Sequence, residues 1–215
     1  MFAPGEYYHL YNRGTDKRDI FLNDRDKHRF VRLLFLCNSD KPVIYREVEN
    51  IPLSEIQRGK TLVSIGAYCL MKNHFHLLVR EDVDGGIVIF MHKLLTAYST
   101  YFNIKYERSG ALFGSRFKSS HLNTDQYLKY MFSYIHLNPL KIMDKNWRDK
   151  KLDPKKVKNY LERYSYSSYN EYIGVKRNEN LILDRMAFPS YFEKTEDFEE
   201  EICSWFLKYD PHSNT

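Results

Sequence analysis

The chain has 215 residues, of which 43% are hydrophobic and 28% are charged, and its formal net charge is +5, so it reads as a soluble globular protein. No apolar run approaches the roughly 20 residues that a membrane span requires, and the first residues do not pair a basic start with an apolar stretch, so we expect a cytoplasmic protein. The three cysteines are odd in number, widely spaced and without a CxxC pair, which argues against a disulfide framework or a zinc knuckle and favours core positions.

The first part of the chain is predicted to alternate between strand, helix and loop. Residues 6–13 are aromatic and are followed by a glycine, which predicts a strand. Residues 23–38 begin with Asn23, a residue type favoured as a helix N-cap, and have apolar residues at helical spacing, which predicts a helix. Residues 39–60 contain two prolines and a glycine, and we expect a loop or a loosely ordered insertion there.

A β-hairpin is predicted next, from residues 61–71 and 74–80, with a tight turn at residues 72–73. Its second strand carries His74 and His76. Side chains at i and i+2 point to the same face of a strand, so the two imidazoles would lie side by side and could hold a metal ion. The alternative is two half-buried histidines with ordinary hydrogen bonds, and the spacing alone leaves both interpretations open.

The second part of the chain is predicted to contain two helices separated by a strand. Residues 87–110 show a helical apolar pattern that stops at Gly110, and residues 111–122 are predicted as a strand. Residues 124–138 are predicted as a helix with Thr124 as its N-cap and its end at Asn138. Its positions i, i+4, i+7 and i+11 lie on one face and place a phenol one turn from an amide; they are Tyr127, Met131, Tyr134 and Asn138.

Charge and aromatic residues suggest a nucleic-acid partner without proving one. Residues 141–158 carry eight Lys or Arg against three Asp, whereas residues 193–201 carry six acids against one Lys. A basic body with 18 Tyr and 14 Phe suits a groove that neutralises phosphates while bases stack on rings. A solvated charged face over an ordinary aromatic core explains the same composition equally well.

Five sequence blocks resemble, in order and spacing, those of transposases of the IS200 type, in particular the REP-associated tyrosine transposases. The blocks are GEYYHLYNRGTDKRDIF, AYCLMKNHFHLLVR, ALFGSRFKSS, YIHLNPLK and YSYSSY. The resemblance runs from about residue 5 to about residue 173. It implies the α+β fold of the His-hydrophobe-His (HUH) endonucleases, a ferredoxin-like antiparallel β-sheet packed by α-helices. We therefore expect a catalytic domain over residues 1–173 and a C-terminal extension over residues 174–215 with an amphipathic helix. We expect the apolar residues of this helix to pack on the body of the protein; they are Phe198, Ile202, Trp205 and Phe206.

The resemblance also implies a site. Tyr134 matches the nucleophile of the family, His74 and His76 match its metal ligands, and Asn138 matches the position that completes the metal site. Lys72 stands where relatives usually have Pro, and IS200 transposases proper often have Gln at the third-ligand position. Two imidazoles and an amide oxygen suit Mg²⁺ or Mn²⁺, whereas a closed zinc site would need a fourth protein ligand.

The implied activity is that of a metal-dependent single-stranded DNA endonuclease and strand transferase that forms a 5′-phosphotyrosine intermediate, acting at DNA hairpins. His136 is expected at the surface or in contact with DNA, since it points to another side of its helix. The expected DNA-binding residues are Arg13, Arg18, Arg116, Lys118 and Lys141.

Two other functions remain open at this point. One is a non-catalytic nucleic-acid-binding module, because ferredoxin-like sheets with aromatic residues also bind RNA. The other is an unrelated metal hydrolase that uses the same histidine pair. The sequence also leaves open whether the chain acts as a monomer or as a homodimer that shares active sites.

Overall fold

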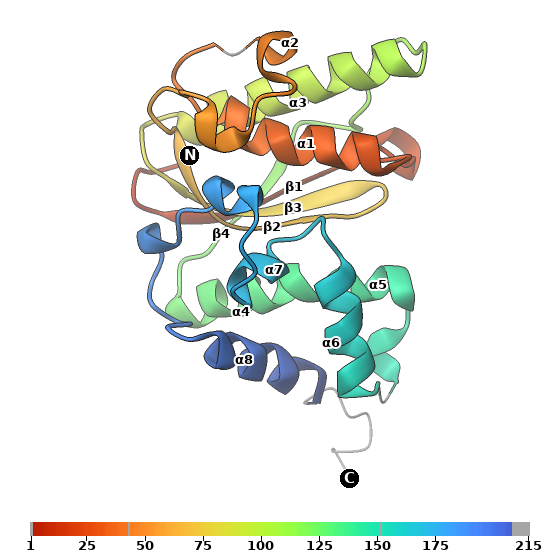
Figure 1. Ribbon diagram of the computed structural model, residues 1–215, viewed down its shortest axis with the longest axis vertical. Helices are drawn as coiled ribbons and strands as arrows, with labels where there is room; N and C mark the ends of the chain where they lie inside the picture. The colour runs from red at the N-terminus through yellow and green to blue at the C-terminus, as the bar shows by residue number, and fades with distance from the viewer. Residues whose placement is uncertain (1, 43, 151, 208–215) are drawn as a thin grey trace.

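An antiparallel β-sheet lies between two layers of helices (Figure 1). The computed structural model describes residues 2–42, 44–150 and 152–207, without the side chains of residues 206 and 207. Within these residues the sheet has four strands in the order β2-β3-β1-β4, and all neighbouring strands are antiparallel. The strands are β1 (Tyr7–Arg13), β2 (Val63–Leu70), β3 (His74–Glu81) and β4 (Lys118–His121).

Two long helices cover one face of the sheet. α1 (Asp24–Cys37) lies between β1 and β2 in the chain, α3 (Gly86–Lys105) lies between β3 and β4, and the two helices pack side by side (Figure 1). The chain thus follows a β-α-β-β-α-β path with β1 and β3 in the centre of the sheet, which is the ferredoxin-like arrangement. The predicted α+β class and ferredoxin-like sheet are confirmed.

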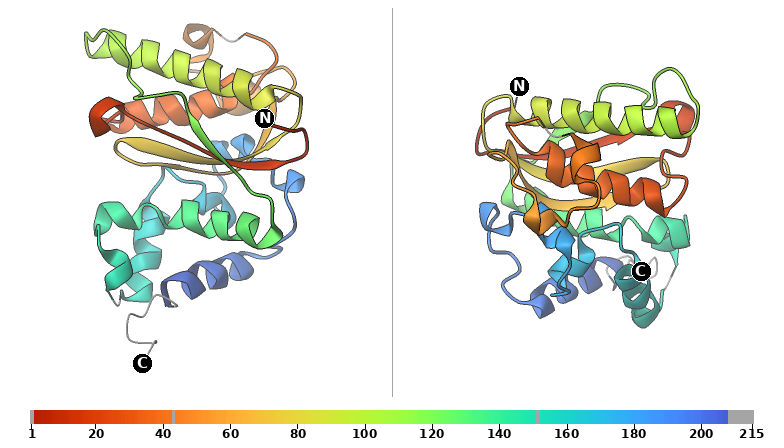
Figure 2. Two further views of the ribbon diagram at one scale, coloured as in Figure 1. Left: turned by 180° about the vertical axis from the view of Figure 1, so that it is seen from behind. Right: turned by 45° about the horizontal axis from the view of Figure 1, so that its top comes forward.

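The opposite face of the sheet is covered by the C-terminal half of the chain. Figure 2 shows the segment after α3 running down past the sheet to α4, which begins this second layer. Its helices are α4 (Asp125–Leu137), α5 (Leu140–Met143), α6 (Pro154–Arg163), α7 (Tyr169–Tyr172) and α8 (Thr195–Leu207). The other short elements described are α2 (Tyr45–Val48) and 3-10 turns at Thr15–Lys17, Leu53–Glu55, Trp147–Asp149, Asn178–Ile182 and Arg185–Ala187.

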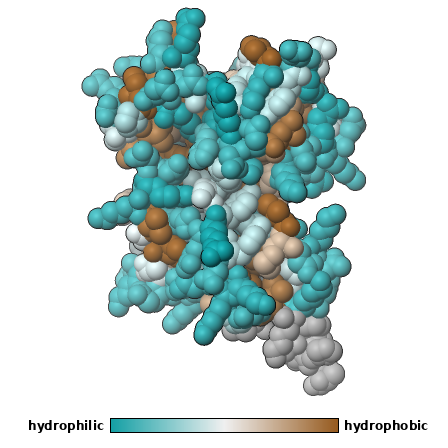
Figure 3. Space-filling view, turned by 45° about the vertical axis from the view of Figure 1, so that its right-hand side comes forward, coloured by the Kyte–Doolittle hydropathy of each residue, from teal (hydrophilic) through white to brown (hydrophobic). Residues whose placement is uncertain are grey.

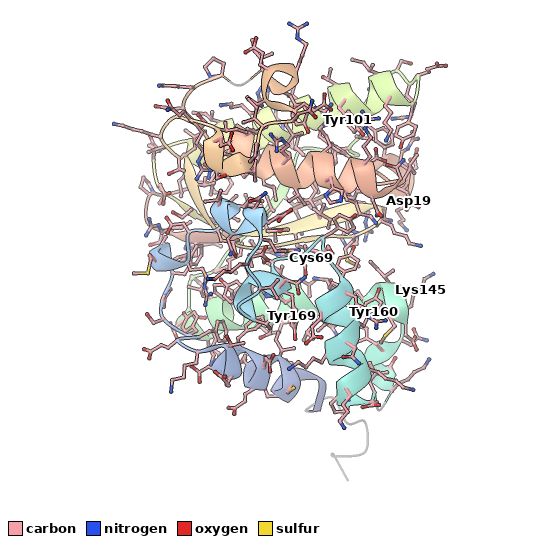
Figure 4. The ribbon with its side chains drawn as sticks, viewed as in Figure 1. Asp19, Cys69, Tyr101, Lys145, Tyr160 and Tyr169 are labelled. Atoms are coloured by element: carbon pink, nitrogen blue, oxygen red, sulfur yellow. The ribbon has the colours of Figure 1, made fainter. Side chains whose placement is uncertain are left out.

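Successive side chains of each strand point to opposite faces of the sheet, so the sheet has two hydrophobic cores, one on each face. Leu10 and Phe75 belong to the core beneath α1 and α3, whereas Cys69 and Leu78 belong to the core against α4 and α8. Figure 4 shows Cys69 between the sheet and this second layer. The expected core positions are confirmed for Cys69 and Cys37, which are both buried, while the third cysteine, Cys203, is only partly buried; all three are free thiols.

The predicted local signals are largely confirmed. The Asn23 side chain accepts a hydrogen bond from the backbone N–H of Asp26 and so caps α1, and Thr124 caps α4 in the same way. The turn between β2 and β3 is closed by a 2.8 Å bond from the N–H of Met71 to the carbonyl of His74. These contacts fix where α4 and β3 begin, and both elements carry candidate site residues.

Two predicted boundaries are wrong. The strand predicted over residues 111–122 is reduced to β4, because its first half bonds to the loop after β1, as in the 3.0 Å bond from the Thr15 N–H to the Leu112 carbonyl. The helix predicted to stop at Gly110 ends at Lys105, since the chain turns early through the left-handed residue Glu107, whose φ is 49°.

The C-terminal segment is part of the same packing. Phe198 and Ile202 of α8 are buried against α4, as predicted, and Trp205 packs partly against the same cluster; the predicted contact of Phe206 lies outside the described side chains. The boundary at residues 173 and 174 stays a prediction about the catalytic unit, since residues on both sides share this core.

None of the described helices is both long and apolar enough to cross a membrane. The face shown in Figure 3 is mostly hydrophilic, with apolar side chains in small separate patches. Such scattered patches are usual on a protein surface, and they assign no function by themselves.

Candidate active site

A cavity of about 690 Å³ lies on the α4 side of the sheet. Three strands and α4 enclose it, because the odd-numbered residues of β1 and the even-numbered residues of β3 and β4 point toward that helix. The side chains that line it are mainly aromatic, imidazole and cationic. They include His9, Tyr11, Arg13, Lys17, His74, His76, Lys118, Tyr127, Tyr130, Tyr134 and Lys141.

The first predicted ligand, His74, is held in one tautomer by the hairpin turn. Its Nδ1 lies 2.6 Å from the Oδ1 of Asn73, and the amide nitrogen of Asn73 donates to the carbonyl of Lys17 at 2.9 Å. Because the Asn73 oxygen can only accept, we assign the imidazole proton to Nδ1. Burial, and then the charges of Arg13 and Lys141, lower the pKa of His74 to about 4. His74 is thus neutral at pH 7 and keeps a lone pair on Nε2.

The second predicted ligand, His76, is held by a histidine that sequence reasoning missed. The Nδ1 of His76 lies 2.9 Å from the Nε2 of His9 on β1. The Nε2 of His76 is buried and has no hydrogen-bond partner among the described residues. A protonated Nε2 would be an orphaned buried donor, which is the costlier state, so we assign the His76 proton to Nδ1, donating to His9.

Burial keeps this pair of rings neutral. It lowers the pKa of His9 to about 4 and that of His76 well below its usual range. Neutral imidazoles are the form that binds metals, and both predicted ligands keep a free Nε2. These two rings therefore fit a divalent ion. Among the described residues no group of three or more His, Cys, Asp or Glu is arranged to hold a metal.

Tyr134 faces the histidines from α4. Its ring centroid lies 5.6 Å from that of His76 and 5.8 Å from that of His9, with the rings edge to face. Burial raises the pKa of Tyr134, and the charge of Arg148 acts in the opposite direction. The structure thus brings the predicted nucleophile and both predicted histidine ligands into one cavity.

Asn138 lies one turn along α4, as predicted, but just outside the cavity lining. It is 1% exposed, its amide nitrogen donates to the Tyr134 carbonyl at 2.9 Å, and its Oδ1 accepts a 2.9 Å bond from the Nζ of Lys141. Lys141 itself lines the cavity, with Nζ 5.3 Å from the centre of the Tyr134 ring. The amide oxygen expected at the metal therefore holds a lysine in this structure.

The predicted DNA-binding residues divide into two groups. Arg13, Lys118 and Lys141 line the cavity. Arg18 and Arg116 are exposed and do not line it, and Arg18 bonds the carbonyl of Thr15 at 3.0 Å. The first group thus shares a cavity with Tyr134, whereas the second group lies at the surface outside that cavity.

The prediction for His136 is wrong. The side chain is fully buried, because the sheet covers one side of α4 and α7 and α8 cover the other. Its Nδ1 lies 2.8 Å from the Phe132 carbonyl, and its Nε2 lies 2.7 Å from the Oγ of Ser168, which also accepts from the N–H of Tyr68 on β2. His136 thus ties the helix that carries the tyrosine to the sheet.

We expect His136→Leu to lower the free energy of unfolding by roughly 1–3 kcal/mol, because Ser168 and Phe132 lose a buried partner. Burial lowers the pKa of His136 from 6.5 to about 3, so the unfolded chain takes up a proton first as the pH falls. The parent should therefore lose stability between pH 6.5 and 3, and the variant should lose less over this interval. Urea unfolding at several pH values measures both effects.

The exposed His92 on α3 provides a control for this experiment. We expect His92→Leu to change the free energy of unfolding by less than about 0.5 kcal/mol. Equal effects of the two substitutions would contradict the role assigned to His136.

Comparisons with known proteins place most of the chain in one family. The family model described as "Transposase IS200 like" matches residues 7–138. A solved structure of a REP-associated tyrosine transposase bound to a REP hairpin is similar, with 10% sequence identity, a TM-score of 0.47, and coverage of 83% of this chain and 87% of that chain. No match was found among curated proteins. The matched residues include His9, both predicted histidine ligands, Tyr134 and Asn138, whereas α5 to α8 lie beyond them.

Proposed function

Since the chain belongs to the family of IS200-like transposases, we propose that it is a metal-dependent endonuclease and strand transferase that acts on single-stranded DNA at hairpins. The observation that carries the proposal is one cavity that holds a phenol and two neutral imidazoles with free Nε2 atoms. The choice of hairpin DNA as substrate follows from the resemblance of the five sequence blocks to the REP-associated tyrosine transposases.

In this proposal Tyr134 is the nucleophile. Its Oη forms a bond to the scissile phosphorus, the bond from phosphorus to the 3′ oxygen breaks, and the phenolic proton passes to water while the leaving oxygen takes one up as a 3′ hydroxyl. The 5′ phosphate stays on the protein as a phosphotyrosine. A 3′ hydroxyl from another strand can reverse the step, so strands are joined without an external energy source.

His74 and His76 would hold Mg²⁺ or Mn²⁺ through their Nε2 atoms. Such an ion, when bound, neutralises the phosphate oxygens that otherwise repel a nucleophile. Asn138 is the proposed third ligand; one lone pair of its Oδ1 accepts the bond from the Nζ of Lys141, and the second lone pair is left for a metal. A DNA phosphate in the cavity gives Lys141 an alternative partner, together with Arg13 and Lys118. We propose that Arg18 and Arg116 contact the backbone farther out.

A covalent-adduct assay tests the proposal. Labelled single-stranded hairpin DNA is incubated with the protein and Mn²⁺, and the products are separated before and after protease treatment. We expect a protease-sensitive covalent adduct. A nucleic-acid-binding module would shift the DNA but form no adduct, and a water-activating hydrolase would cleave without one.

We expect His9→Phe to weaken Mn²⁺ binding about 10- to 100-fold, because it keeps a ring in place but removes the acceptor that orients His76. Calorimetric titration of the DNA-free protein with Mn²⁺ measures this without any cleavage. The control is His121→Phe. His121 is a more exposed histidine on β4 that bonds Glu6, so its replacement should leave the affinity for Mn²⁺ unchanged. Unchanged affinity in His9→Phe would reduce His9 to a packing residue.

A further inference from the structure

A row of aromatic rings continues from Tyr134 along α4 and onto α8. The ring centroids of Tyr134 and Tyr130 are 5.9 Å apart, those of Tyr130 and Tyr127 are 6.4 Å apart, and those of Tyr130 and Trp205 are 4.7 Å apart. The three tyrosines follow i, i+3 and i+7 spacing, so they lie on one face of α4. The row begins inside the candidate active site and ends on a helix outside the family match.

The row forms the wall between two cavities. Tyr127 and Tyr130 line the main cavity, and they also line a second one of about 430 Å³ that Lys129, Glu201 and Trp205 complete. Tyr127 is 36% exposed, so its ring is accessible at this shared wall. The rings of Tyr127 and Tyr130 are near parallel, with 18° between their planes. A single DNA strand that leaves the main cavity on this side would therefore contact an aromatic surface directly.

The charges around the second cavity are already balanced. One carboxylate oxygen of Glu201 lies 3.1 Å from the Nζ of Lys129, and the other accepts a 2.7 Å bond from the indole N–H of Trp205. Glu201 is thus paired with a cation and does not stand as an isolated negative charge. The indole N–H of Trp205 is also used, so the ring has only its apolar surface to offer a ligand.

We infer that the single strand adjoining the scissile phosphate runs from the main cavity over Tyr127 and Tyr130 to Trp205, with its bases stacked on these rings. The inference rests on the proposed function, and it adds where the unpaired flank of the hairpin is bound. Stacking suits this surface because every base has an aromatic face, so aromatic rings bind single strands with little sequence preference. The chain's own α8 then takes part in substrate binding.

Tryptophan fluorescence tests this directly, because the chain has two tryptophans and the other, Trp147, is 3% exposed. In Trp147→Phe the emission comes from Trp205 alone. We expect quenching by a hairpin with a single-stranded flank and none by the same hairpin without one. Separate 5′ and 3′ flanks show which side of the scissile phosphate is bound, and quenching by either supports the inference.

The affinity of the protein for hairpins with and without a single-stranded flank provides a second test. We expect Trp205→Ala and Tyr127→Ala each to weaken binding of the flanked hairpin about tenfold, with little change for the unflanked one. Trp205→Phe should retain most of the affinity, because it keeps a ring. Trp205→Ala also removes packing between α8 and the rest of the protein. Tyr127→Ala tests the same surface without that loss, because the Tyr127 ring is more exposed than the Trp205 ring.

The adduct assay on the parent protein distinguishes failure of the stacking surface from failure of the proposed covalent chemistry. Adduct formation together with flank-independent fluorescence and full affinity in both Ala variants would overturn the inference and leave the proposed function intact. Flank-dependent quenching without any adduct would overturn the proposed chemistry while the surface still binds single strands.

Discussion

Tyr134→Phe is expected to form no covalent adduct with hairpin DNA and to transfer no strand. The substitution removes one oxygen and keeps the ring that packs against His9 and His76, so the stability should change by about 1 kcal/mol or less. The basic side chains of the cavity are unchanged, so the variant should bind the hairpin with the parent's salt dependence. Gel separation of adducts and binding titrations at several salt concentrations measure both.

The neighbouring tyrosines of α4 are matched controls for this variant. Tyr127→Phe and Tyr130→Phe remove the same oxygen from rings that line the same cavity. Both should retain the adduct, because neither is the proposed nucleophile. Loss of the adduct in one of these variants together with its persistence in Tyr134→Phe would show that the wrong tyrosine has been assigned.

His76→Ala is expected to abolish cleavage while hairpin binding stays within about threefold of the parent. The substitution removes a free Nε2 from the cavity, whereas affinity for DNA comes mainly from phosphate and base contacts. Mn²⁺ binding to the DNA-free protein should be lost in parallel. Cleavage of labelled hairpin over a range of Mn²⁺ concentrations, with binding measured on the same samples, tests this expectation.

His74→Ala is the companion variant and should behave in the same way. Because His76 is buried, its replacement also leaves a cavity that can cost roughly 2 kcal/mol or more, so thermal unfolding must show that both variants are folded at the assay temperature. His74 is more exposed and carries less of this risk. Full cleavage by both variants would contradict the proposal that a metal ion held by His74 and His76 is needed for cleavage.

Much of the fold could be predicted because its signals are local. The hairpin of β2 and β3 follows from two apolar runs and a short turn, and the N-caps at Asn23 and Thr124 follow from residue type. The length of β4 could not be predicted in this way. Residues 111–117 contain strand-like apolar residues, but their backbone bonds to the loop after β1, which is distant in sequence.

In the site, too, the residues that depend on local spacing could be predicted, and those that depend on contacts distant in sequence could not. The i, i+2 spacing of His74 and His76 places them on one face of β3, and the resemblance to a family selected Tyr134. His9 was missed because its contact with His76 depends on the register between β1 and β3, which one strand cannot reveal. His136 was misplaced because its helical position does not show that a second layer of helices covers α4.

Mass spectrometry of the trapped protein–DNA adduct identifies the residue that attacks the DNA. After incubation with hairpin DNA and Mn²⁺, the adduct is digested with protease and nuclease and the modified peptide is sequenced. We expect a 5′-phosphotyrosine on Tyr134. A DNA-linked peptide modified at any other residue would contradict the assignment of the nucleophile, and cleaved DNA without a protein adduct would contradict the mechanism.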